Sequence, residues 1–398
     1  MPANFLHGVE TVYVEKGAVP VRVVKSAVIA LVGSAPSGPV NVPTLVLSDK
    51  DAAQFGAAGG DYTIPNALKA ILDHGAANVV VINVATAGQA ANAVTAAAVI
   101  GGTDAVTGQR SGLEALKDCF SLFGFVPKIL IAPVFCTQNS VATALITKAT
   151  QLRAIALIDA PIGTTVQQAI TGRGPSGTIN FQTSSDRAVL CYPHLKRYDA
   201  ATDSTVLEPM SQRLAGLMAK NDLDNGYWWS PSNKEFSGVV GVERTISAAV
   251  NDATTEANLL NENGIVTVFN SFGTGFRSWG NRTAAWPTVS HPRNFINIRR
   301  TADIVAESLE LAMLQFIDKP INQAVIDSIR DTVNAFLRTL VARGAIIDGE
   351  CTFDPAKNPP TEIAAGHLTF DYSLMPPTPA ERITFEQFVD IELLAALS

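Results

Sequence analysis

The hydrophobic positions between residues 26 and 220 fall into short uninterrupted runs, separated by segments whose apolar residues recur every three or four positions. Uninterrupted runs of this length are typical of strands buried on both faces, and their alternation with helices favours a largely parallel sheet. We therefore predict an α/β domain over residues 26–255. The predicted strands are 28–32, 45–47, 79–84, 129–132, 154–158 and 188–191, and the helix candidates include 65–74, 112–120 and 140–152.

The pattern changes between residues 256 and 375, where we predict a second, α+β domain. A strand at 265–269 precedes a glycine-rich hairpin, and two helices follow. Thr301 is the expected cap of the first helix, which ends before Pro320, and the second helix covers 322–343. Further strands are predicted at 345–353 and 367–374. The expected core positions of the two helices are Val305, Leu309, Ala312, Phe316, Ile326, Ile329, Val333, Phe336, Leu337 and Leu340.

Both ends of the chain read as extended arms, at residues 1–25 and 376–398. Near the N-terminus, valines alternate with other residues, and Pro20 in this run suits an edge strand or an arm. Near the C-terminus, three prolines form a stiff spacer before a segment with strict period-two alternation of apolar and mostly acidic residues. The apolar faces comprise Val19, Val21 and Val23 in the first arm and Ile383, Phe385, Val389, Ile391 and Leu393 in the second.

A lone strand behind a proline spacer cannot satisfy its own backbone hydrogen bonds, and its apolar face would aggregate in water. Addition of this strand to the sheet edge of another copy removes both problems. The arms therefore predict a homo-oligomer held together by strands exchanged between copies.

Candidate catalytic chemistry is weak throughout the chain. The glycine spacing at 33–38 is that of a phosphate loop, but Pro39 and Val40 replace the lysine and hydroxyl residue that bind phosphate and Mg²⁺. The G-x-G-x-x-G match at 172–177 follows a helix-like segment, and we interpret it as a surface turn. Asp159 follows a predicted strand, where α/β enzymes place catalytic groups, but capping or turn formation explains it better. We predict no catalytic, metal-binding or cofactor-binding residue, and keep a nucleotide-binding α/β enzyme as the alternative.

Composition limits the partners and the compartment. The 398-residue chain has a formal net charge of −7, which does not favour nucleic acid. Charged residues make up only 16% of the chain, which indicates a surface largely covered by protein partners. We expect no signal peptide and no membrane anchor, because the required apolar segments are absent from the sequence. The four cysteines are widely scattered and are expected to be free core thiols.

Three of the four tryptophans fall within two nearby segments, 225–241 and 278–283. Large aromatic side chains dominate cores and interfaces, so we interpret these segments as a place where two parts of the chain meet. Segments 227–239 (YWWSPSNKEFSGV) and 279–283 (WGNRT), with FLHGV at 5–9, resemble the signature of contractile-tail sheath proteins, the family of the sheaths of P2-like phages and R-type pyocins. The matching residues are Tyr227, Trp228, Trp229, Pro231, Ser232, Asn233, Lys234, Glu235, Trp279, Gly280, Asn281 and Arg282.

The resemblance implies a structural subunit without enzymatic activity. It implies that the α/β domain projects outward, inserted between the N-terminal arm and an inner α+β domain whose sheet is completed by the arms of neighbouring subunits. The subunits would form a helical sheath of hexameric rings around a tail tube, with baseplate and tail terminator proteins as further partners. Contraction of this sheath would drive the tube through a cell envelope.

The resemblance also bears on location and on the tube contact. The expected location is a phage tail or a bacteriocin particle, assembled in the host cytoplasm. Arg330 and Arg338, on the second long helix, are the candidates to face the tube, and solvated helix charges are the alternative for them. Another phage shell protein remains a further alternative to the sheath.

A thermal-shift measurement separates the enzyme class from the sheath class. A ligand that binds only the folded protein raises the melting temperature of the protein, and the rise depends on the ligand concentration. We expect ATP and NAD to leave the melting temperature unchanged. A saturable rise with either nucleotide would instead support the nucleotide-binding alternative.

Overall fold

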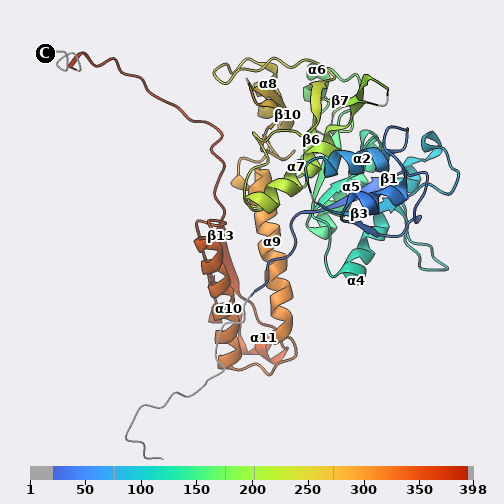
Figure 1. Cartoon of the computed structure of the whole chain (residues 1–398). Helices are drawn as coiled ribbons and strands as arrows, with labels where there is room; N and C mark the ends of the chain where they lie inside the picture. The colour runs from blue at the N-terminus through green and yellow to red at the C-terminus, as the bar shows by residue number, and fades with distance from the viewer. Residues whose placement is uncertain (1–20, 76, 175, 201, 272, 393–398) are drawn as a thin grey trace, which may run out of the picture.

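The computed structural model describes residues 21–75, 77–174, 176–200, 202–271 and 273–392. These residues form a large α/β body and a slimmer body of helices and strands beside it, and the C-terminal segment extends away from both (Figure 1). Within the described residues, no helix is long and apolar enough to cross a bilayer.

The large body is built on an eight-stranded sheet of order β11-β10-β6-β5-β4-β1-β3-β2. Neighbouring strands from β10 to β3 are parallel, whereas the edge strands β2 and β11 are antiparallel to their neighbours. The prediction of an α/β fold with a largely parallel sheet is thus confirmed, and the two antiparallel edge strands make the sheet mixed. Its strands are β1 (Val28–Gly33), β2 (Thr44–Val46), β3 (Asn78–Asn83), β4 (Ile129–Ile131), β5 (Ile155–Asp159), β6 (Ala188–Cys191), β10 (Ile265–Ser271) and β11 (Gly275–Trp279).

Helices cover both faces of this sheet, which explains why the middle positions of its central strands are apolar. On one face, α2 (Thr63–Leu72) and α7 (Met210–Asp224) pack on Ile29, Leu31 and their neighbours. On the other face, α5 (Asn139–Leu152) packs on Val28, Ala30 and Val32. The helix predicted at 112–120 is instead a 3-10 helix, Gly112–Asp118, followed by α4 (Cys119–Phe123).

Smaller elements complete the large body. A three-stranded sheet of order β8-β7-β9 consists of β7 (Leu195–Asp199), β8 (Ser204–Glu208) and β9 (Val239–Val242). Further short helices are α1 (Asp49–Ala52), α3 (Ala96–Ile100), α6 (Val166–Thr171) and α8 (Glu256–Glu262).

The slimmer body pairs two long helices, α9 (Ile296–Met313) and α10 (Gln323–Ala342), with a two-stranded antiparallel sheet. The strands of this small sheet are β12 (Asp348–Thr352) and β13 (Asp371–Met375), and α11 (Pro360–Ala364) lies between them in the chain. The core contains most of the predicted helix positions, Val305, Leu309, Val333, Phe336, Leu337 and Leu340. Ile326 is also buried.

Two expectations for this region are corrected. Thr301 is not a cap, because α9 begins at Ile296 and the Thr301 hydroxyl donates to the Asn297 carbonyl oxygen inside the helix at 2.8 Å. The strand β10 does not belong with the small sheet, because it lies parallel to β6 and buries Val266 and Val268 in the core of the large body. Sheet continuity therefore extends the large body beyond residue 255.

Helix α9 joins the two bodies through buried ion pairs. The Arg300 guanidinium binds the Asp222 carboxylate on α7, with Nη1 and Oδ1 2.7 Å apart. Arg187, which directly precedes β6, binds Asp303 with Nη2 and Oδ1 2.8 Å apart. Lys128, which directly precedes β4, binds Glu307, and burial lowers the pKa of Lys128. The carboxylates of α9 thus meet cations at the amino-terminal edge of the large sheet.

Replacement of Asp222 by Asn tests this joint. Removing one partner of a buried ion pair leaves an uncompensated charge, so we expect the free energy of unfolding to fall by about 3–5 kcal/mol in thermal or denaturant unfolding. As a control, Arg110→Ala removes the half-exposed Arg110–Asp118 pair, and we expect a loss of at most about 1 kcal/mol. Equal losses in the two variants would contradict a special role for the buried pair.

Candidate functional site

The aromatic junction, defined as residues 225–241 and 278–283, forms along the outer edge of β11. The Asn233 N–H donates to the Ser278 carbonyl oxygen at 2.7 Å, and the Ser278 N–H donates to the Lys234 carbonyl oxygen at 2.9 Å. The Ser278 hydroxyl donates to the Pro231 carbonyl oxygen at 2.5 Å, and the Gly280 N–H donates to the Ser232 hydroxyl at 3.0 Å. These bonds hold an irregular loop in one shape and cover a sheet edge.

Trp228 connects this loop to the slimmer body. Its indole packs against the core between α9 and α10, and its carbonyl oxygen accepts from Asn297 Nδ2 on α9 at 3.0 Å. Its ring also meets Tyr227 edge-to-face, with 5.0 Å between centroids. Gly226 has φ of 106°, and a Cβ there would lie 2.5 Å from the Trp228 ring, so a side chain at this position would displace the indole. The junction is thus where the two bodies meet, as its composition indicated.

The remaining signature residues have distinct surroundings. Trp279 stacks on Phe269 with 4.8 Å between ring centroids, whereas Trp229 is half exposed beneath the Lys234 ammonium. Glu235 pairs with Arg277 through an isolated antiparallel bridge. The carbonyl oxygen of the buried Asn281 accepts from the Ile296 N–H at the start of α9 at 3.0 Å. The guanidinium of Arg282 lies over the rings of Trp286 and Phe295.

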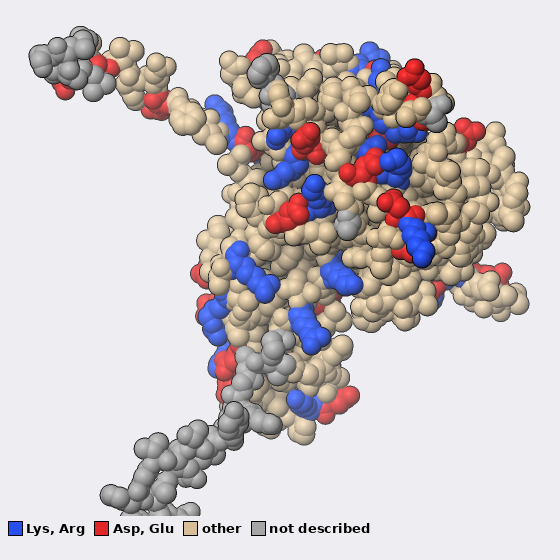
Figure 2. All heavy atoms as spheres, viewed as in Figure 1, with Lys and Arg blue, Asp and Glu red and all other residues tan. Residues whose placement is uncertain are grey.

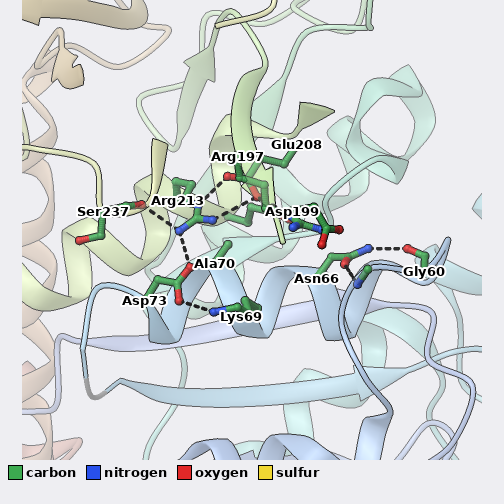
Figure 3. Close-up of polar contacts among 12 residues, drawn as sticks. Gly60, Asn66, Lys69, Ala70, Asp73, Arg197, Asp199, Glu208, Arg213 and Ser237 are labelled. Atoms are coloured by element: carbon green, nitrogen blue, oxygen red, sulfur yellow. Dashed lines mark hydrogen bonds and ion pairs between the residues drawn. The ribbon is translucent and has the colours of Figure 1, made fainter. Parts of the chain in front are cut away.

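A buried arginine that the sequence analysis did not select anchors the same loop. Figure 3 shows Arg213 of α7 at the centre of contacts from three directions. Its Nε donates to Glu208 Oε1 at 2.5 Å, and its Nη1 donates to Asp73 Oδ2 and to the Ser237 carbonyl oxygen, both at 2.8 Å. Arg213 is only 1% exposed, so its charge depends on these partners. The available signal was an arginine that directly precedes the apolar run 214–219.

His74 makes a second anchor to this loop. Its Nδ1 lies 3.0 Å from the Ala70 carbonyl oxygen, and its Nε2 accepts from the Ser237 N–H at 3.2 Å. This pattern requires a neutral ring with the proton on Nδ1. Burial lowers the pKa of His74 to about 4, and the nearby Arg213 acts in the same direction.

The C-terminal arm is extended and exposed. Residues 382–392 lead away from both bodies, and in the space-filling view this part of the arm stands clear of the rest (Figure 2). Ile383, Phe385, Val389 and Ile391 are 69%, 89%, 88% and 76% exposed. The segment forms no strand within its own chain over the described residues, and Leu393 lies outside them. Its predicted role between subunits stays a prediction.

The described end of the N-terminal arm, from Val21 onwards, packs on the slimmer body that carries the small sheet. Val21 and Val23 pack against its core, and the Val24 N–H donates to the Ser308 hydroxyl of α9 at 3.1 Å, whereas Val19 lies outside the described residues. In the described part of the chain, β12 and β13 pair only with each other. Each of them therefore has an outer edge that another strand can join.

The two candidate tube-facing arginines differ in their surroundings. Arg330 contacts Asp327 at 3.2 Å and Asp331 at 3.1 Å, so acidic neighbours on α10 offset its charge. Arg338 is exposed. On the face shown in Figure 2, basic and acidic side chains are interspersed.

The residues and loops considered above for catalysis or phosphate binding take part in burial and packing within the large body. Asp159 is buried and accepts from the Ser211 N–H in the first turn of α7 at 2.7 Å, and burial raises its pKa. In the 33–38 loop, the Phe55 ring fills the space beside Gly38. All four cysteines are free and buried, and burial raises the pKa of Cys136 and Cys191 well above the usual range. Over the described ranges, no cluster of His, Cys, Asp and Glu suits a metal ion.

Comparisons with known families match most of the chain. The phage tail sheath protein central domain matches residues 98–284, and the phage tail sheath C-terminal domain matches residues 288–390. The tail sheath protein of Burkholderia phage BcepMu is 48% identical over 474 aligned positions, which cover 100% of this chain and 99% of the relative. The tail sheath protein of Escherichia phage P2 is 31% identical, with 99% of this chain and 98% of the relative covered.

Solved structures share the fold at low sequence identity. The helical sheath of the anti-feeding prophage in its contracted state has a TM-score of 0.69 at 20% identity, covering 97% of this chain and 100% of that one. The contracted PVC sheath complex, from an extracellular contractile injection system, has a TM-score of 0.67 at 16% identity, covering 98% and 100%.

The anchoring of the junction predicts a pH dependence. The unfolded chain protonates His74 near pH 6.5, but the folded protein does so only near pH 4, so acidification favours the unfolded state between these values. We expect this one group to lower the free energy of unfolding by on the order of 3 kcal/mol from pH 6.5 to pH 4. In His74→Gln, which retains a donor and an acceptor but does not titrate, denaturant unfolding should lose less stability over this interval. Identical pH profiles would contradict the assignment.

Proposed function

The chain belongs to the contractile phage tail sheath family, and from this premise we propose that it polymerises helically around a tail tube and contracts to drive that tube through the target cell envelope. The observation that carries this proposal is the exposed C-terminal arm. A strongly apolar, alternating segment that stands clear of its own fold needs another copy to cover it.

The small sheet is the proposed acceptor of the arms. The C-terminal arm of one copy adds to an outer edge of β12 or β13 in another copy. Val21 and Val23 pack on the core of their own subunit, so the part of the N-terminal arm that includes Val19 is the part proposed to connect to a further neighbour. Burial of Ile383, Phe385, Val389 and Ile391 stabilises this contact by roughly 1.5–3 kcal/mol each. Each ladder hydrogen bond adds about 1 kcal/mol. Contacts of this head-to-tail kind that do not close a ring produce a helix.

The two bodies correspond to the proposed outer and inner domains of the subunit. The α/β body projects outward, and the body built on α9, α10, β12 and β13 faces the tube. The match of two family domains with a break between residues 284 and 288 supports a boundary there, and so does the pairing of β10 with β6. We therefore move the proposed boundary from residue 255 to about 285, and keep the two terminal arms.

The partners and the location follow from the same proposal. The sheath surrounds a tail tube and meets a baseplate and a tail terminator at its ends, within a virion tail or a bacteriocin particle assembled in the host cytoplasm. Arg338 is the better of the two tube-facing candidates, because Arg330 already contacts two carboxylates on its own helix.

Deletion of residues 382–398 tests the role of the arm. We expect the truncated protein to keep the wild-type melting temperature, because the described part of the removed segment, residues 382–392, is exposed throughout. We expect it to form no cylinders by electron microscopy and sedimentation. A double variant, Phe385→Asp with Val389→Asp, should behave in the same way, whereas Thr384→Ser on the opposite face should polymerise normally. Cylinders formed by the truncated chain would contradict the proposal.

A further inference from the structure

The C-terminal arm is attached to its own subunit at two points before it becomes free. Asn297 Nδ2, at the start of α9, donates to the Pro377 carbonyl oxygen at 3.2 Å as well as to Trp228. Four residues later in the arm, Glu381 receives a two-pronged contact from the Arg282 guanidinium, and Arg282 Nε lies 2.8 Å from Glu381 Oε1. The first contact attaches the arm to α9, and the second attaches it to the aromatic junction.

Aromatic rings and hydrogen bonds fix the position of the Arg282 guanidinium. The guanidinium carbon lies 3.8 Å from the centre of the Trp286 ring and 4.4 Å from the centre of the Phe295 ring, so aromatic faces fix its plane. Its Nη1 donates to Asn294 Oδ1 at 2.9 Å, which leaves Nε and Nη2 directed at Glu381. A planar, two-pronged contact with a carboxylate restricts direction as well as distance, which a lysine cannot do.

The arm has little attachment beyond this contact. Every residue from 382 to 392 is exposed, and residues 382–385 line an open groove of about 870 Å³ between the arm and the 248–258 segment. Residue 381 is therefore the last point at which a side chain of the body holds the arm, over the part of the chain that the structure describes.

We propose that Arg282, held between Trp286 and Phe295, is a positioning residue that clamps Glu381 and so sets the direction and the reach of the C-terminal arm toward the next copy. This inference rests on the proposed function of the arm. With the clamp closed, the described free segment from Arg382 to Glu392 spans at most about 40 Å. Opening the clamp frees residues 378–381 as well, back to the Pro377 attachment, and adds up to about 14 Å. The clamp thus limits how far apart two linked copies can be.

The test uses the full chain with Thr384→Cys labelled by a fluorescent maleimide. The native cysteines are all buried, so the dye reacts at the introduced thiol. Time-resolved anisotropy of the unpolymerised protein reports arm mobility, and sedimentation reports the critical concentration for assembly. We expect Arg282→Ala and Glu381→Gln to increase the fast depolarisation and to raise the critical concentration about tenfold, as the loss of a charge-assisted contact predicts. Arg282→Lys keeps the charge but cannot make the two-pronged contact. We expect its depolarisation and its critical concentration to lie between those of these variants and the wild type.

Controls separate this inference from the proposed function. Arg110→Ala removes a comparable ion pair in the large body and should change neither readout. Glu381 is 41% exposed, so Glu381→Gln tests the clamp without risk to the core if Arg282→Ala unfolds. Unchanged label mobility in Glu381→Gln would overturn the clamp, and so would a freed arm that assembles at the wild-type concentration. If the wild-type protein forms no cylinders, the proposed function fails, while the anisotropy still reports whether the clamp holds the arm.

Discussion

The buried ion pairs of α9 are the interaction on which the rest of the structure depends. The two bodies have largely separate hydrophobic cores, and hydrophobic contact alone does not specify how they are oriented. Arg300 with Asp222 and Arg187 with Asp303 supply that orientation, because a buried charge is tolerated only where its partner lies. These buried pairs therefore fix how the two bodies are oriented within the subunit.

Much of the fold follows from short-range patterns in the sequence. The central strands and α10 could be predicted because their hydrophobic positions repeat with the period of the element and because both faces of the sheet are covered. The placement of β10 could not be predicted, since an apolar strand followed by a hairpin fits either sheet and only its pairing with β6 decides. The predicted start of α9 is too late because Ile296 is buried in the core of the large body, which is built from segments distant in the sequence.

The candidate site was predictable in composition but not in geometry. The tryptophans and polar residues of the aromatic junction stand out in the sequence, and their side chains do hold a loop and join two bodies. Arg213 and His74 contact this loop from α7 and from the end of α2, more than a hundred residues apart in the chain, and no local pattern predicts such contacts. The contact between Arg282 and Glu381 also joins distant segments, so the sequence alone does not connect the arm to the aromatic junction.

The covered edge of β11 has a consequence for how copies associate in a crowded cell. An exposed edge strand of a broad sheet can pair with strands of other chains, which leads to aggregation and amyloid-like stacking. Here residues 233–236 occupy one flank, and the opposite flank ends in β2, which has only three residues. Both features disfavour non-specific strand addition to the larger body. Newly made subunits can therefore stay soluble at high concentration until they assemble into an ordered lattice.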